Sequence, residues 1–89
     1  MVLSVMNRKQ RATLEAIFSE PVPKNLSWTD IETLLTAIDC KVKNRGGSKV
    51  GFGKDNEMLN VHRPHPQKEA KGHVIKKVKD FLISLGVPP

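Results

Sequence analysis

The sequence predicts an α+β fold in which helices cover one face of a three-stranded antiparallel sheet. Apolar residues recur at helical spacing near the start and the end of the chain, and between these regions apolar and polar residues alternate as they do in strands. The predicted order is helix, helix, strand, strand, strand, helix. The 89 residues suffice for one domain with a modest core. Within this single domain, residues 1–89, we distinguish an N-terminal helical extension, residues 1–23, from a core, residues 24–89.

The first predicted helix covers residues 7–19. Asn7 is a candidate N-cap, and Gln10 at the third helical position completes the pattern of a capping box. The following "EPVP" ends the helix, because proline neither continues a helix nor favours one before it. The apolar face of this helix contains Leu14, Ile17 and Phe18.

Two further helices follow from the same spacing rule. In the second, Ser27 is the predicted N-cap and Asp30 completes its capping box. Trp28 shares the spacing of the aliphatic residues and is therefore predicted to pack in the core rather than to stack on bases. The last helix begins near Gly72 and ends at Gly86. The predicted apolar positions of these helices are Trp28, Ile31, Leu34, Leu35, Ile38, Val74, Ile75, Val78, Phe81, Leu82 and Leu85.

Three short strands are predicted between the helices, at Cys40–Arg45, Ser48–Gly53 and Glu57–His62. Successive side chains of a strand point to opposite faces, so each strand has an inward and an outward set. The inward residues are Cys40, Val42, Val50, Phe52, Leu59 and Val61. The outward residues are Lys41, Lys43, Arg45, Lys49, Asn60 and His62. This gives the sheet a basic open face.

The pairing of the strands follows from the predicted turns. A two-residue turn at residues 55–56 suits Asp and Asn, which tolerate positive φ, and it places Lys49 directly opposite His62. A three-residue loop at "RGG", residues 45–47, pairs Val42 with Val50 and makes Lys43 a neighbour of Lys49. Two adjacent lysines destabilise a sheet unless an anion lies between them or both extend into solvent.

The composition favours a polyanionic partner. Fifteen Lys and Arg residues against nine Asp and Glu give a net charge of +6, which indicates nucleic acid unless the charge serves solubility alone. The single cysteine excludes an internal disulfide and suits a reducing cytoplasm. No segment is long and apolar enough to cross a bilayer, so we expect a cytoplasmic protein without a membrane partner.

Several kinds of site fit the residues poorly. His62 and His65 are spaced like two zinc ligands, but a zinc site needs further donors and the surrounding charge is positive, so neither a metal nor another cofactor is expected. Ser48 and Cys40 lack the signature of an activated nucleophile. The glycine-rich "RGGSKVGFG" fits no phosphate-binding loop, because a strand follows it and not a helix.

Metal-free RNA cleavage fits better, because the RNA carries its own nucleophile in the 2′-hydroxyl group. Histidine moves protons near neutral pH, and a cation beside it stabilises charge on phosphorus. The predicted catalytic residues are His62, Lys49 and His65, and the predicted RNA-binding residues are Lys41, Lys43, Arg45, Ser48 and Arg63. A rigid loop position between two prolines explains His65 equally well. His73 is expected to be an exposed surface residue.

Three stretches resemble the HicA-type toxins of bacterial toxin–antitoxin pairs. They are "GGSKVGF", "LNVHRPHPQKEAKG" and "VIKKVKDFLISLGVPP", and "RATLEAIFSEPVPKNLSWTDIETLL" is similar to the N-terminal extension of one branch of that family. The resemblance implies a fold like the double-stranded RNA-binding domain. It also implies an mRNA interferase, that is, an endoribonuclease that cleaves mRNA and arrests translation, and a HicB-type antitoxin that masks the active surface.

The chain departs from the family at one position. Many members carry a catalytic histidine two residues after the glycine of the "GS" step, where this chain has Lys49. A lysine is normally protonated and stabilises charge without acting as a base. Either His62 has taken over proton transfer or catalysis is weak or absent. The competing hypotheses are a non-catalytic RNA-binding module, an antitoxin-bound regulator and a docking surface for an acidic antitoxin.

Overall fold

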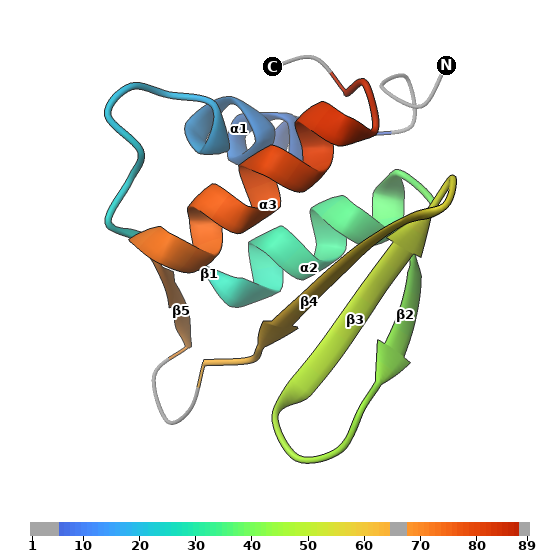
Figure 1. Ribbon diagram of the computed structural model, residues 1–89. Helices are drawn as coiled ribbons and strands as arrows, with labels where there is room; N and C mark the ends of the chain where they lie inside the picture. The colour runs from blue at the N-terminus through green and yellow to red at the C-terminus, as the bar shows by residue number, and fades with distance from the viewer. Residues whose placement is uncertain (1–5, 65–67, 88–89) are drawn as a thin grey trace.

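The computed structural model describes residues 6–64 and 68–87. It confirms the α+β prediction: three helices gather on one side of an antiparallel sheet with the strand order β2-β3-β4 (Figure 1). A second sheet of two short strands, β1 and β5, lies beside it. The elements are α1 (Arg8–Ile17), β1 (Asn25–Ser27), α2 (Trp28–Ala37), β2 (Lys41–Asn44), β3 (Lys49–Lys54), β4 (Glu57–His62), β5 (Glu69–Lys71) and α3 (Gly72–Ser84).

Helix α1 begins at the predicted capping box. The Asn7 side chain accepts a hydrogen bond from the Gln10 backbone N–H at 2.8 Å, and the Gln10 side chain accepts one from the Asn7 backbone N–H at 3.0 Å. Leu14 and Ile17 are buried, and α1 packs against α2 and α3. The extension therefore shares the core of the rest of the chain. The division at residue 23 stays a prediction.

Ser27 is the N-cap residue of α2, as predicted, but the predicted capping box is wrong. The Ser27 side chain makes no capping hydrogen bond, because the Ser27 backbone belongs to β1 and is paired there with Glu69. The Trp28 backbone N–H donates to the carbonyl of Lys68 at 2.9 Å. The Asp30 carboxylate lies 3.6 Å from the Lys9 ammonium and links α2 to α1.

The β3–β4 hairpin has the predicted register. Asp55 and Asn56 form its two-residue turn with φ of 53° and 68°, so Phe52 lies opposite Leu59. Lys49 is directly opposite His62, as predicted.

The predicted register between β2 and β3 is wrong by two residues. Val42 lies opposite Phe52, not Val50, and Lys43 lies opposite Gly51. The loop follows Arg45, whose backbone N–H donates to the Lys49 carbonyl at 3.0 Å, so it consists of residues 46–48 rather than 45–47. Both loop glycines adopt positive φ, 97° and 56°, whereas the predicted loop required this of only one. The two lysines are therefore not cross-strand neighbours.

The two-stranded sheet was not predicted. Leu26 of β1 pairs with Ala70 of β5, and Ala70 is almost fully buried. This pairing fixes the chain immediately before both α2 and α3, since each helix begins at the residue after its strand.

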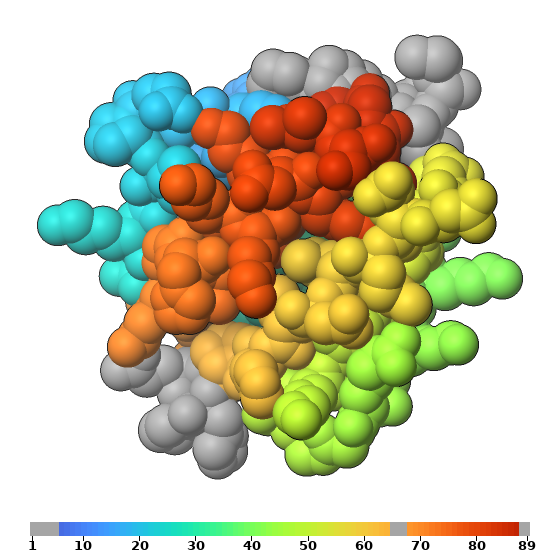
Figure 2. All heavy atoms as spheres, in the orientation of Figure 1, coloured from blue at the N-terminus to red at the C-terminus, as the bar shows by residue number. Residues whose placement is uncertain are grey.

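A single apolar cluster joins the helices to the inner face of the sheet. Trp28 is buried as predicted, and its ring meets that of Phe52 edge to face at a centroid distance of 6.1 Å. Figure 2 shows α3 and β4 packed side by side at the surface. Val42 differs from its prediction: it is 40% exposed, because β2 is an edge strand of the sheet. The last helix ends as predicted, with Gly86 at a φ of 78°.

An ion pair joins α3 to the segment after α1. The Lys79 ammonium donates a hydrogen bond to the Glu20 carboxylate at 2.7 Å. This bond and the charge of Lys79 lower the pKa of the Glu20 carboxyl group below its usual value.

The Phe52→Ala substitution tests the core. Phe52 is fully buried beneath the helices, so its removal leaves a cavity and is expected to lower the free energy of unfolding by about 3 to 5 kcal/mol. Urea denaturation measures the loss. The matched control is Ile83→Ala, where the side chain is 55% exposed and the change should stay within about 0.5 kcal/mol. Equal losses in both variants would contradict this description of the core.

Candidate active site

The outward residues of the three central strands form a basic surface, which we call the open sheet face. The register aligns Lys43, Gly51 and Asn60 in one cross-strand row, and Lys49 with His62 in another. Two outward positions of the central strand β3 are glycine, Gly51 and Gly53. The side chains of β2 and β4 therefore rise on either side of a surface that has no side chains. The open sheet face consists of Lys41, Lys43, Arg45, Lys49, Gly51, Gly53, Met58, Asn60 and His62.

A groove of about 480 Å³ runs over these glycines. Its charged lining residues are three lysines and three carboxylates: Lys41, Lys43, Lys54, Asp39, Asp55 and Glu57. The contact of Lys41 and Lys43 with RNA stays a prediction. Arg45 lies across the floor: a Cβ atom at Gly51 would come within 2.8 Å of the Arg45 Nε. The Arg45 Nη2 also lies 3.9 Å from the Met58 Sδ. The guanidinium group is therefore held along the sheet and not extended freely into solvent.

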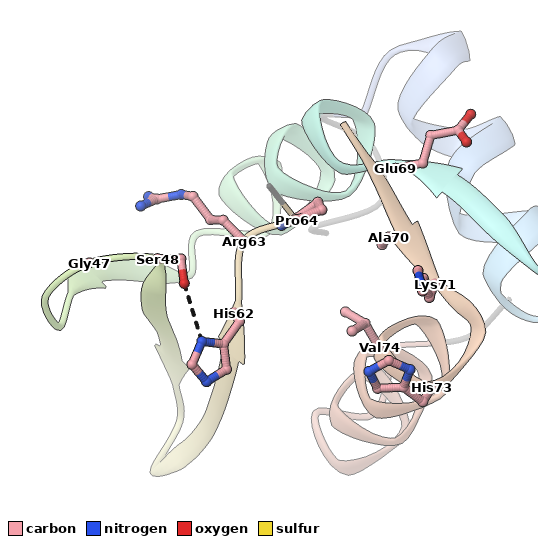
Figure 3. Close-up of a pocket in the computed structure, with 10 residues that line it drawn as sticks. All are labelled: Gly47, Ser48, His62, Arg63, Pro64, Glu69, Ala70, Lys71, His73 and Val74. Carbon is pink, nitrogen blue, oxygen red and sulfur yellow. Dashed lines mark hydrogen bonds between the residues drawn. The ribbon is translucent and has the colours of Figure 1, made fainter. Parts of the chain in front are cut away.

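A larger pocket of about 1010 Å³ opens where β3 begins and β4 ends, at the opposite end of the hairpin from its turn. It lies between this end of the hairpin and the start of α3 (Figure 3). We call it the histidine pocket. Its lining residues come from the β2–β3 loop, the end of β4, β5 and the first turn of α3. They are Gly47, Ser48, His62, Arg63, Pro64, Glu69, Ala70, Lys71, His73 and Val74.

His62 is oriented within this pocket by Ser48. The Ser48 Oγ lies 3.2 Å from the His62 Nδ1, which leaves the Nε2 free (Figure 3). The backbone holds the pair together, because the Arg63 N–H donates to the Ser48 carbonyl at 2.7 Å. When the Nδ1 carries the proton and donates a hydrogen bond to the Ser48 Oγ, the Nε2 carries the lone pair that a general base needs.

Arg63 points away from the pocket centre (Figure 3). Its Nη2 lies 3.4 Å from the Glu32 Oε2 in α2, and both side chains are about one-third exposed. The contact ties the end of β4 to the helix layer. Arg63 therefore anchors the strand on which His62 lies.

The wall of the pocket opposite His62, which is formed by β5 and the first turn of α3, was not predicted from the sequence. We call it the far wall. His73 is exposed, as predicted, but it lies across the pocket from His62 (Figure 3). Glu69 and Lys71 of β5 border the same wall. The placement of His73 in the first turn of α3 was predictable, but the wall depends on the pairing of β1 with β5, which was not.

Lys49 and His65 remain to be placed. Lys49 is exposed and directly opposite His62 in the backbone register, but it is not among the described residues that line the histidine pocket. Its ammonium group therefore belongs to the open sheet face beside the pocket. His65 lies outside the described residues.

Three further properties of the described residues concern metal ligands, the cysteine and the helices. Within residues 6–64 and 68–87, no group of three or more His, Cys, Asp or Glu side chains is arranged to hold a metal ion. Cys40 is buried beside the sheet, and burial raises the pKa of its thiol to about 11. In the same described ranges, no helix has the length and apolar character needed to span a membrane.

The fold and the pocket define a small basic α+β protein with an exposed histidine at the edge of an open sheet. Residues 28–87 match the family model described as the HicA toxin of bacterial toxin–antitoxin systems. This range covers more than half of the chain, so the protein belongs to the HicA toxin family, whose toxins are paired with an antitoxin. Comparison with curated proteins and with solved structures gave no match.

Cys40 is expected to be chemically inert in the folded protein. Only the thiolate reacts readily, and the raised pKa makes it about 100-fold rarer near pH 8 than in an unperturbed cysteine. Labelling with iodoacetamide at pH 8 should therefore be slow in the native protein and rapid in urea. Equal rates in both conditions would show that the thiol is accessible and not desolvated.

Proposed function

We propose that the protein is the toxin of a toxin–antitoxin pair and acts as a metal-independent endoribonuclease that cleaves mRNA and arrests translation. The main support is His62, which is exposed in a pocket, oriented through its Nδ1 by Ser48 and adjacent to a surface rich in lysine and arginine. Membership of the HicA toxin family supports the same conclusion.

In this proposal His62 transfers protons and Lys49 stabilises negative charge. The Nε2 of His62 takes a proton from the 2′-hydroxyl group of the RNA, whose oxygen attacks the adjacent phosphorus. Lys49 stands where many relatives have a histidine, and its ammonium group supplies the charge that the phosphorane needs. Ser48 positions His62. His65 stays a candidate for an assisting role.

The open sheet face holds the RNA backbone. Lys41 and Lys43 border the groove over the glycines, and Arg45 lies on its floor, so three cations contact successive phosphates. Their separation from the pocket allows one part of the strand to be bound while another is cleaved. The ion pair between Arg63 and Glu32 of α2 supports this arrangement from the helix layer.

The proposed partner is a HicB-type antitoxin that covers the histidine pocket and the open sheet face. An acidic partner segment would complement the lysines of β2 and exclude RNA by occupying the same surface. The proposed location is the cytoplasm, where mRNA is available. No cofactor is needed, because the RNA supplies its own nucleophile.

Lys49 also favours a second candidate function, a non-catalytic RNA-binding module or antitoxin-bound regulator. A protonated lysine cannot replace a catalytic histidine as a base. If His62 does not take over this role, the same basic surface binds RNA without cleaving it. The two functions both require salt-sensitive binding, and only the first requires cleavage.

The His62→Ala substitution distinguishes these functions. It is expected to reduce cleavage of a single-stranded RNA by at least about 100-fold, because the general base is lost, and to abolish growth arrest when the toxin is induced. Gel analysis of an end-labelled RNA measures the first effect, and culture density measures the second. Cleavage by the wild type should persist in EDTA.

The control is Lys76→Ala, at an exposed residue of α3 that is not among the described residues lining the pocket, and this variant should cleave at the wild-type rate. Thermal unfolding establishes that His62→Ala remains folded. Cleavage retained by a folded His62→Ala would remove His62 from the mechanism. A wild-type protein that binds RNA but never cleaves it would establish the second candidate function instead.

The Lys43→Ala substitution tests the open sheet face. Each phosphate contact contributes about 0.7 to the slope of log affinity against log salt for a single strand, so the slope should fall by roughly that amount. Fluorescence anisotropy with a 2′-O-methyl oligonucleotide, which cannot be cleaved, measures it. Lys76→Ala removes the same charge elsewhere and should leave the slope unchanged. An equal fall in both variants would mean that the effect reflects net charge alone.

A further inference from the structure

We propose that His73 is a second catalytic residue, which donates a proton to the leaving 5′-oxygen while His62 accepts the proton of the 2′-hydroxyl group. The inference rests on the proposed ribonuclease function. It starts from the observation that the histidine pocket is lined by an imidazole on each of two opposite walls (Figure 3).

The two imidazoles are positioned by different parts of the fold. His62 is the last residue of β4 and is held by Ser48 from the neighbouring strand end. His73 is in the first turn of α3, which follows β5 directly, and β5 is fixed through the pairing of Ala70 with Leu26. The packing of α3 against β4 therefore sets the spacing of the two imidazoles, and a substrate phosphate in the pocket would lie between them.

Both histidines are available for chemistry. Each is exposed, so solvent and substrate can reach both rings. Ser48 occupies only the Nδ1 of His62, and among the described residues His73 has no side-chain hydrogen bond or ion pair. At least one nitrogen of each ring is thus free for the substrate.

One further charged group of the pocket favours a phosphate: Lys71, the residue immediately before α3, is a cation. Arg63 is paired with Glu32 and points away from the pocket centre, so its role is to anchor the strand (Figure 3). Glu69 is the one carboxylate among the described lining residues. The first turn of α3 contains no acidic residue, so no carboxylate of that turn repels an anion from His73.

The reaction requires an acid as well as a base. The His62 Nε2 removes the 2′-hydroxyl proton, the 2′-oxygen forms a bond to phosphorus, and the bond from phosphorus to the 5′-oxygen breaks. The His73 imidazolium donates its proton to that oxygen. The products are a 2′,3′-cyclic phosphate and a 5′-hydroxyl end, and His62 is left protonated and His73 neutral. Solvent then restores both, so no water, metal or redox partner is consumed.

The His73→Ala substitution tests this role through the leaving group. After the cleavage site of the wild type has been mapped on a single-stranded RNA, the 5′-bridging oxygen at that site is replaced by sulfur. The thiol that corresponds to this 5′-thiolate has a pKa of about 8.5, far below that of an alcohol. The thiolate therefore leaves without being protonated, whereas the ordinary 5′-oxygen needs an acid. His73→Ala is expected to cleave the ordinary RNA at least about 100-fold more slowly than the wild type and the sulfur-containing RNA within about twofold of it. His62→Ala should lose both activities.

Two further measurements complete the test. His73→Ala should bind a 2′-O-methyl oligonucleotide with wild-type affinity and unfold at the wild-type temperature, and Lys76→Ala should behave as the wild type throughout. Equal losses on both substrates, weakened binding that accounts for the loss, or undiminished cleavage of ordinary RNA would each overturn the role of His73. A wild type that cleaves neither substrate would overturn the ribonuclease function itself, and the inference with it.

Discussion

Burial of alternate residues of β3 and β4 beneath the helices is the constraint on which the site depends. Val50, Phe52, Leu59 and Val61 are between 0% and 5% exposed, and they occupy successive inward positions of the hairpin. A slip of one residue in either strand would exchange its two faces and expose these side chains. The free energy of burying them therefore also determines that His62 faces outward.

The histidine pocket depends on a second, independent constraint. Its near wall belongs to the three-stranded sheet and its far wall to β5 and α3, so the pocket depends on the packing of α3 against β4 and on β5, which directly precedes α3. Ser48 and Glu32 support the near wall through His62 and Arg63. This arrangement places the two proposed catalytic histidines on a strand and on a helix, although the protein is small.

The parts of the fold that were predicted correctly depend on local signals. The Asp55–Asn56 turn and the alternation on either side of it determined the β3–β4 register, and the Asn7 capping box determined the start of α1. Ser27 carries the same local signal as a cap, but a strand pairing with a distant segment overrides it. Three-residue strands have no measurable periodicity, so the β1–β5 sheet and the far wall of the pocket could not be predicted. His62 and Ser48 were identified as site residues, whereas their contact and the position of His73 depend on tertiary packing.

Helix α1 lies outside residues 28–87, the range that matches the family, yet it packs in the common core. Leu14 and Ile17 are at most 2% exposed, and Met6 beside them is 8% exposed. Burial of three such side chains contributes roughly 4 to 9 kcal/mol, which is comparable to the entire stability of a small domain, about 5 to 15 kcal/mol. The residues that precede the family-matching segment therefore contribute a large share of the stability of the common core, and substitutions that loosen α1 are expected to lower the folded fraction of the whole protein.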